Sequence, residues 1–277
     1  MRSLATLGII AGMCGCGRLR FDPLATGDGK ISDVTSSQIG DAPAVDYCAQ
    51  VPALGADPID DGVLEPGLTA IPIVPLWLGP GMVPAGVSAR YAVGWRSDRL
   101  YIFVDVTDPD RWPAVAGEQP YCGDAVELFV DSDGMYPSVP MYDNPGTRQM
   151  VIVAPADDVD PVARAIIGHD GQTIGAWSGT FHAYPRSGGY LVEAIVEAAD
   201  LGLASWTLAG HVGVDVGVDV STPDGGPGNG LSSCTTNGGL GHRLGQFALQ
   251  LTTPTGSCTN GDPYCDVRAF CNPILAP

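Results

Sequence analysis

The sequence predicts an all-β protein: an antiparallel, jelly-roll-like β-sandwich with a short, disulfide-stapled C-terminal tail. Several segments alternate apolar and polar residues with a period of two, as half-buried strands do. Turn-forming residues separate them, and the 277 residues include 38 glycines and 24 prolines. No stretch has a sustained helical period. Many short strands separated by turns are typical of a sandwich.

Eight segments are expected to be strands, and the first two flank a short Arg-Ser-Asp turn as a hairpin. They are residues 91–95, 100–106, 124–131, 148–154, 180–185, 189–198, 211–220 and 245–251. One helical turn is expected within 197–203.

The strand at 211–220, HVGVDVGVDV, has the clearest pattern. Its valines form one face, which is expected to join the core. Glycine and aspartate alternate on the other face, which is polar and has little bulk. Two interpretations of that face stay open: a solvated outer surface, or the floor of a shallow groove.

The N-terminus carries an export signal. Arg2 is followed by an apolar run, Leu4–Met13, that is too short to span a bilayer. The sequence MCGC resembles a bacterial lipobox with Cys16 as the lipid acceptor, and a plain secretory signal is the alternative. Either predicts export, and the first predicts a lipoprotein anchored at the cell envelope.

Four regions are therefore expected, with a flexible linker between the lipid and the domain. They are a signal peptide at 1–15, the lipid-anchored linker at 16–46, the sandwich at 47–253 and a Cys-rich tail at 254–277.

The charge of the chain excludes some partners. The formal net charge is −18 and Lys30 is the single lysine. Nucleic acids and anionic lipid surfaces attract clustered basic residues, so neither is an expected partner. Membrane contact is expected only through the N-terminal lipid, and the protein is expected to be monomeric. No G-x-S-x-G or H-E-x-x-H motif occurs, which favours a non-catalytic protein.

The cysteines support an oxidising compartment. Of the eight, Cys14 and Cys16 lie in the signal region, and the remaining six predict three disulfides. Cys48 is expected to bond one tail cysteine, tying the chain ends together. The choices are Cys258, Cys265 and Cys271.

No cofactor is expected, and two further sites have weaker sequence support. Asp131 and Asp133, in VDSDG, either join a calcium site with loop carbonyls or stabilise a turn. Haem binding would need axial ligands on inward strand positions, and Met150 with His211 is the candidate pair.

Five segments, taken in order, resemble a known family. They are PIDDGVLEPG, ARYAVGWRSDRLYIFVDVTD, GDAVELFVD, GGYLVEAIVEAADLGL and VGVDVGVDVSTPDG. The chain, over roughly residues 57–251, is similar to the family 9 carbohydrate-binding modules and their DOMON-like relatives. The resemblance implies a β-sandwich that binds saccharide, often attached to polysaccharide-degrading enzymes.

The resemblance also implies site residues. These modules hold a terminal sugar between two tryptophans, and a glutamate contacts its hydroxyls. Tyr121 stands at the first tryptophan position and Glu127 at the glutamate. The second tryptophan has no aromatic counterpart, and Cys234 is roughly where it would stand. Arg148 lies near the position of the family's arginine.

Two expectations follow from this comparison. Antiparallel pairing of the strands at 124–131 and 211–220 predicts a Cys122–Cys234 disulfide at the rim of the sugar site. Trp112, in a loop leading to that site, is the candidate replacement stacking face.

Glu127 itself has two interpretations. It either contacts the ligand or forms a buried ion pair with Arg90 or Arg96, since a buried carboxylate requires a partner. The sequence thus predicts an exported lipoprotein that binds carbohydrate without catalysis. The alternative is a structural or protein-interaction lipoprotein that keeps the fold and has lost the sugar site.

Overall fold

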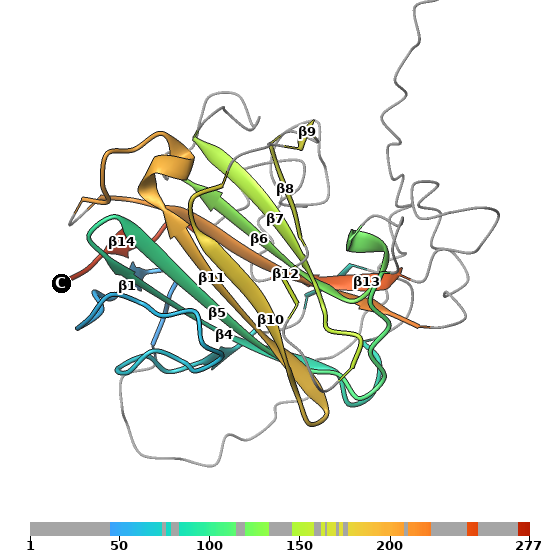
Figure 1. Cartoon of the computed structure of the whole chain (residues 1–277). Helices are drawn as coiled ribbons and strands as arrows, with labels where there is room; N and C mark the ends of the chain where they lie inside the picture. The colour runs from blue at the N-terminus through green and yellow to red at the C-terminus, as the bar shows by residue number, and fades with distance from the viewer. Residues whose placement is uncertain are drawn as a thin grey trace, which may run out of the picture.

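The computed structural model describes most of the sandwich. Its residues are 45–73, 76–78, 83–114, 120–132, 146–157, 162–163, 165–169, 172–173, 177–207, 210–222, 243–248 and 271–277. Two antiparallel sheets face each other, which confirms the predicted all-β sandwich (Figure 1). Within these residues, no helix is both long and apolar enough to cross a membrane.

The first sheet has five strands. In spatial order they are β10 (Thr180–Arg186), β11 (Gly189–Glu197), β5 (Arg99–Thr107), β4 (Ser88–Arg96) and β2 (Ile71–Pro72).

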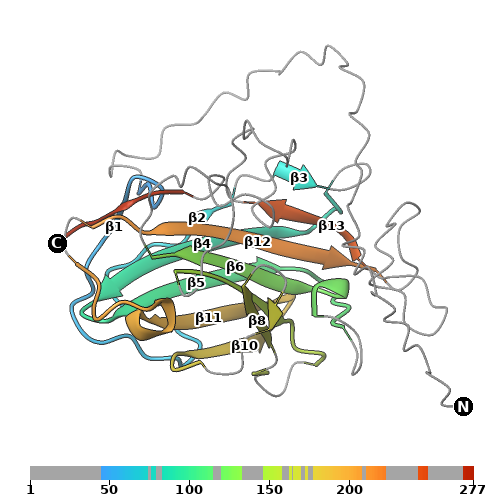
Figure 2. The ribbon, with the colours of Figure 1, turned by 90° about the horizontal axis from the view of Figure 1, so that it is seen from above.

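The second sheet has seven strands. In spatial order they are β3 (Leu76–Leu78), β13 (Arg243–Ala248), β12 (Gly213–Ser221), β6 (Ala125–Asp131), β7 (Thr147–Val153), β8 (Ala165–His169) and β9 (Gln172–Thr173). Viewed from above, β12 and β6 lie side by side near the middle of this sheet (Figure 2).

All eight predicted strands are confirmed, with ends that differ by a few residues. The expected helical turn is η2 (Ala198–Leu201), which ends at Gly202 with φ 75°. The strands that the sequence did not predict are β1 (Gln50–Val51), β2, β3, β8, β9 and β14 (Ile274–Leu275). These have two to five residues each, too few to show a period.

The core lies between the two sheets and follows the predicted alternation. The valines of β12, from Val214 to Val220, are buried in it, which confirms their expected core role. Val126, Leu128 and Val130 of β6 lie beside them, and Ile102 is among the residues that β5 contributes. The opposite residues of β6 and β12 therefore face outward from the sandwich.

The outer face of the five-stranded sheet is covered by a loop of the chain itself. Glu193 of β11 is buried on that face, and its carboxylate accepts hydrogen bonds from the N–H groups of Asp61, at 2.8 Å, and Gly62, at 2.5 Å. The Tyr101 hydroxyl donates to the same carboxylate at 2.6 Å. Residues 54–66, hereafter the covering loop, are thus anchored to the sheet.

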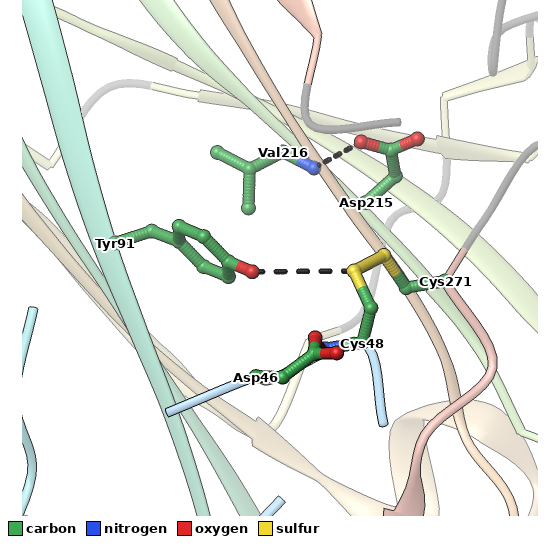
Figure 3. The surroundings of a disulfide bond; sticks show 6 residues. All are labelled: Asp46, Cys48, Tyr91, Asp215, Val216 and Cys271. Carbon is green, nitrogen blue, oxygen red and sulfur yellow. Dashed lines mark hydrogen bonds between the residues drawn. A yellow bond between two sulfur atoms is a disulfide. The ribbon is translucent and has the colours of Figure 1, made fainter. Parts of the chain in front are cut away.

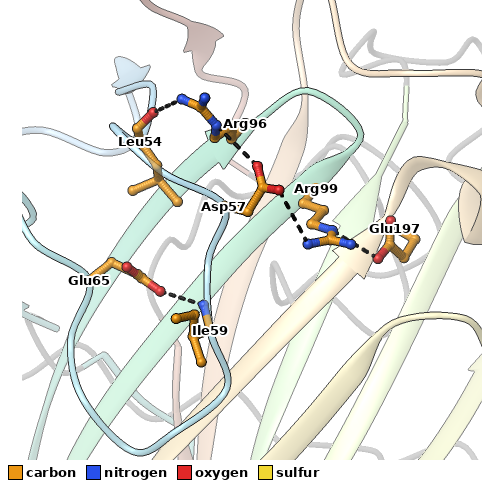
Figure 4. Close-up of polar contacts among 7 residues, drawn as sticks. All are labelled: Leu54, Asp57, Ile59, Glu65, Arg96, Arg99 and Glu197. Carbon is orange, nitrogen blue, oxygen red and sulfur yellow. Dashed lines mark hydrogen bonds and ion pairs between the residues drawn. The ribbon is translucent and has the colours of Figure 1, made fainter.

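Ion pairs fix one edge of the covering loop (Figure 4). Arg96 Nε lies 3.1 Å from Asp57 Oδ1, and Arg99 Nη1 lies 3.9 Å from Asp57 Oδ2. Arg99 Nε also contacts Glu197 Oε1 at 3.1 Å. Because Asp57 is exposed and the arginines and Glu197 are only partly buried, each pair stabilises the fold by less than about 1 kcal/mol.

A disulfide joins the segment that precedes β1 to the C-terminal segment (Figure 3). Cys48 is bonded to Cys271, with Cα atoms 4.9 Å apart, which confirms that Cys48 pairs with a tail cysteine. Strands β1 and β14 pair in parallel beside it. Trp95 Nε1 of β4 donates to the Ala276 carbonyl at 2.8 Å. The described part of the tail therefore packs as part of the sandwich.

Candidate functional site

The outer face of the seven-stranded sheet carries a row of polar side chains. Registers place Glu127 of β6 level with Gly217 of β12, and Asp219 of β12 level with both Ala125 and Gln246. On the neighbouring strand β7, Gln149 also faces outward and lies diagonally across from Glu127. We call this set the polar face; it comprises Glu127, Gln149, Asp215, Asp219 and Gln246.

The polar face is withdrawn from solvent. Glu127 is 3% exposed, and Asp215 and Asp219 are buried. The interpretation of the aspartate face of β12 as a solvated surface is therefore wrong. Buried carboxylates need hydrogen-bonding partners, and Asp215 Oδ1 accepts one hydrogen bond from the Val216 N–H at 2.7 Å.

Gln149 is the partner that the sequence did not identify for Glu127. Its amide Nε2 donates to Glu127 Oε2 at 2.7 Å. The expected ion pair is not formed, because Arg90 and Arg96 lie on the five-stranded sheet. Arg90 donates to the Ala70 carbonyl, and Arg96 bonds to Asp57. A glutamine at a strand position gives no sequence signal of this kind.

Gly217 leaves room for a second amide on the polar face. A Cβ at this position would lie 2.6 Å from Gln246 Nε2 and 3.0 Å from its Cδ. The Gln246 side chain therefore crosses over β12 at the residue that pairs with Glu127. Two amides and a carboxylate at adjacent strand positions supply both donors and acceptors, as sugar hydroxyls require.

Arg148 lies on the other side of the sheet. It is level with Val130, a core residue, so alternation places it on the face opposite Gln149. Arg148 is buried, and its Nη1 donates to the Thr147 carbonyl at 2.7 Å. The structure therefore does not bring Arg148 to Glu127, and Gln149 takes the place expected for it.

The segments that carry Trp112 and Tyr121 meet at the start of β6. Tyr121 lies in η1 (Pro120–Cys122), which contacts β6, β7 and β12. Trp112 exposes 42% of its surface. Gly123 is required here, because a Cβ would collide with the backbone of Ala114. Both aromatic residues are thus held at one end of the polar face.

Asp124 hydrogen-bonds to two other chain segments at this end of the polar face. The sequence did not predict this role. Its Oδ2 accepts a hydrogen bond from Trp112 N–H, and its Oδ1 accepts one from Ser221 N–H at 2.6 Å. Burial, followed by the nearby Asp108 carboxylate, raises the pKa of Asp124 to about 8. Glu127 lies three residues further along β6, about 10 Å away. We call Trp112, Tyr121 and Asp124 the corner.

Several predicted residues lie outside the described residues. They are Cys16, Asp133, Cys234, Cys258 and Cys265. Cys122 is disulfide-bonded, and its partner lies outside the described residues because Cys48 and Cys271 pair with each other. The Cys122–Cys234 bond stays a prediction.

The alternative metal and haem sites have little support in the described ranges. Asp131 is buried and accepts a hydrogen bond from the Thr147 hydroxyl at 3.2 Å. No three His, Cys, Asp or Glu side chains gather as metal ligands within the described ranges. Met150 is buried in the core, whereas His211 is exposed near the tail, where its Nδ1 lies 3.4 Å from the Asn272 carbonyl oxygen. The structure does not bring the two candidate haem ligands together.

A pocket in the covering loop is a poorer sugar site. It has a volume of about 410 Å³ and is lined by residues between Leu54 and Pro66. None of its lining residues is aromatic, so it offers no ring face to a pyranose. The corner and polar face are therefore the candidate site.

Comparisons with known proteins identify the family and the fold of the chain. The family model described as "Carbohydrate family 9 binding domain-like" matches residues 67–232. No curated protein matches the chain.

Two solved structures of a family 9 carbohydrate-binding module from Caldicellulosiruptor kristjanssonii are similar to this chain. The complex with glucose has 14% identity and a TM-score of 0.54, covering 82% of this chain and 95% of that one. The complex with cellotriose has 14% identity and a TM-score of 0.55, covering 82% and 93%. At this identity the likeness shows the fold alone.

Proposed function

The chain belongs to the carbohydrate family 9 binding domain-like family, and from this premise we propose that it is an exported, non-catalytic lipoprotein that binds glycan or polysaccharide chain ends. The observation that supports the proposal most is the hydrogen bond between Glu127 and Gln149. The exposed Trp112 is held at one end of the same polar face. Glucose and cellotriose, bound by the similar module, are the first ligands to test.

The site would divide the recognition of a sugar between two kinds of group. Trp112 and Tyr121 would supply ring faces for the C–H face of a pyranose. Glu127 accepts hydrogen bonds from hydroxyls, while Gln149 and Gln246 can donate and accept. Because a second clamping tryptophan is missing, we expect weak binding.

Titration calorimetry of the oxidised protein with glucose, cellotriose and xylan tests the proposal. Trp112→Ala should weaken cellotriose binding by about tenfold, equivalent to roughly 1.4 kcal/mol. Ile274→Ala is the matched control, since Ile274 is also 42% exposed but lies in β14, which pairs with β1. Absence of binding to any glycan, with the disulfides intact, would reject the proposal.

Export and lipid attachment are supported by the N-terminal sequence. The Cys48–Cys271 bond supports export, since disulfides persist in oxidising compartments. Expression in a bacterium with labelled palmitate should label the wild-type chain and Cys14→Ser, and fail to label Cys16→Ser. Equal labelling of both variants would contradict acylation at Cys16.

A structural or protein-interaction lipoprotein is the second candidate. The burial of Asp215 and Asp219 favours it, because a face withdrawn from solvent is less accessible to ligand. The calorimetric experiment separates the two, since this alternative predicts no glycan binding by folded protein.

A further inference from the structure

We propose that Asp124 is a positioning residue of the glycan site, which fixes the Trp112 segment and the end of β12 against the start of β6. The binding part of this inference rests on the proposed function, whereas its structural part stands alone. Asp124 touches no ligand in this account and acts only through the segments that it joins.

Four hydrogen bonds converge on this one residue. The carboxylate accepts the N–H groups of Trp112 and Ser221. The Asp124 N–H donates to the Trp112 carbonyl at 2.8 Å, and its own carbonyl accepts from Ala154 N–H at 3.0 Å. Asp124 therefore joins the loop after β5, the end of β7 and the end of β12 to the start of β6.

Two other carboxylates show why this arrangement is unusual. Asp200 accepts the N–H groups of Ser178, at 2.7 Å, and Gly179, at 3.0 Å. Glu193 likewise accepts two N–H groups from consecutive residues of the covering loop. Each of these two carboxylates holds a single turn. Asp124 instead joins segments 12 and 97 residues away in the sequence, so it sets their relative position.

The surroundings make this link hard to replace. Asp124 has 0% exposure, so water cannot substitute for either acceptor oxygen. Two charged groups interact electrostatically with Asp124. They are Asp108, which is also buried, and Arg111. Both belong to the segment that leads to Trp112. Because the Asp124 carboxyl group accepts the Trp112 N–H, its movement would shift the Trp112 segment.

Asp124→Asn is the sharpest variant. The amide has the shape of the carboxyl group but only one acceptor oxygen, and its NH₂ group would face a backbone N–H. Asp200→Asn is the matched control, because it removes the same kind of acceptor from a turn that lies away from the corner.

The experiment combines amide hydrogen exchange by NMR with cellotriose titration on the oxidised full chain. In Asp124→Asn, we expect exchange at Trp112 and Ser221 to accelerate and cellotriose affinity to fall, each by about tenfold. Asp200→Asn should accelerate exchange at Ser178 and Gly179 and leave the affinity unchanged. Unchanged exchange at Trp112 or Ser221 in Asp124→Asn would overturn the inference, as would unchanged affinity.

The wild-type protein gives an independent result if Asp124→Asn does not fold. The Trp112 amide should then exchange slowly although its side chain is exposed, and rapid exchange would overturn the inference. If wild-type protein binds no glycan, the proposed function fails while the exchange results still test the role of Asp124.

Discussion

The outer faces of the two sheets use buried carboxylates in opposite ways. On the five-stranded sheet, Glu193 is sealed beneath the covering loop and satisfied by Tyr101 and two backbone N–H groups. On the seven-stranded sheet, Glu127 bonds to the side-chain amide of Gln149. A carboxylate held by backbone fixes a loop, whereas one held by a rotatable amide can exchange that partner for a ligand hydroxyl.

Two glycines show the same difference between the outer faces of the two sheets. A Cβ at Gly94 would lie 2.6 Å from Leu54 Cδ2 in the covering loop, and a Cβ at Gly217 would lie 2.6 Å from Gln246 Nε2. The first space is filled by an apolar side chain that belongs to the fold. The second is filled by the flexible end of a polar side chain. Stability should therefore depend on the first face and binding on the second.

Removing the Glu193 carboxylate should have the largest effect. Glu193→Ala leaves a buried hydroxyl and two backbone N–H groups without their acceptor, and should reduce the unfolding free energy by about 4 kcal/mol. Urea denaturation measures the change. Glu197→Ala, which removes only a half-buried ion pair with Arg99, is the control. A similarly small loss of unfolding free energy in both variants would contradict the different roles of the two faces.

The two glycines provide the next test. Gly94→Ala should reduce the unfolding free energy by about 2 kcal/mol, because Leu54 and the covering loop must move. Gly217→Ala should cost less, since the Gln246 amide can swing aside, but should weaken cellotriose binding. Thermal unfolding and calorimetry of both variants measure this. Equal stability losses with no change in binding would contradict the assignment of the two faces.

Glu127→Ala should affect binding more than folding. We expect an affinity loss of about tenfold, equivalent to roughly 1.4 kcal/mol, because a hydroxyl acceptor is removed. Titration calorimetry with cellotriose provides the measurement. The control is Asp57→Ala, which removes an exposed carboxylate from the covering loop. Equal affinity in Glu127→Ala and wild type would remove Glu127 from the site.

The contribution of Asp124 to stability should depend on pH. Its pKa is raised to about 8 in the folded state, so its contribution to stability is complete below the unfolded pKa and is lost as pH rises through about 8. The stability of wild type relative to Asp124→Asn should therefore fall with pH, by at most about 1.4 kcal/mol per unit. Urea denaturation at pH 5, 7 and 9 tests this sign. An increase with pH would contradict it.

The sequence predicts the strands of this protein better than its site. The valine alternation in β12 identifies both a strand and its core face, because only one side packs against the apolar core. The register between neighbouring strands has no such signal. A shift of one residue exchanges the two faces of a strand, so the resemblance alone could not show that Arg148 and Gln149 lie on opposite faces of β7. Asp124 was missed because its role depends on contacts with Ser221, far along the chain.

Chemical-shift mapping by NMR, as cellotriose is added to the oxidised protein, tests the central claim most directly. The account predicts saturable shifts at Trp112, Gln149 and Gln246, with none at Ile59 and Val63 in the covering loop. Shifts confined to the covering loop, or no shifts in folded protein with any glycan tested, would contradict the placement of a carbohydrate site on the seven-stranded sheet.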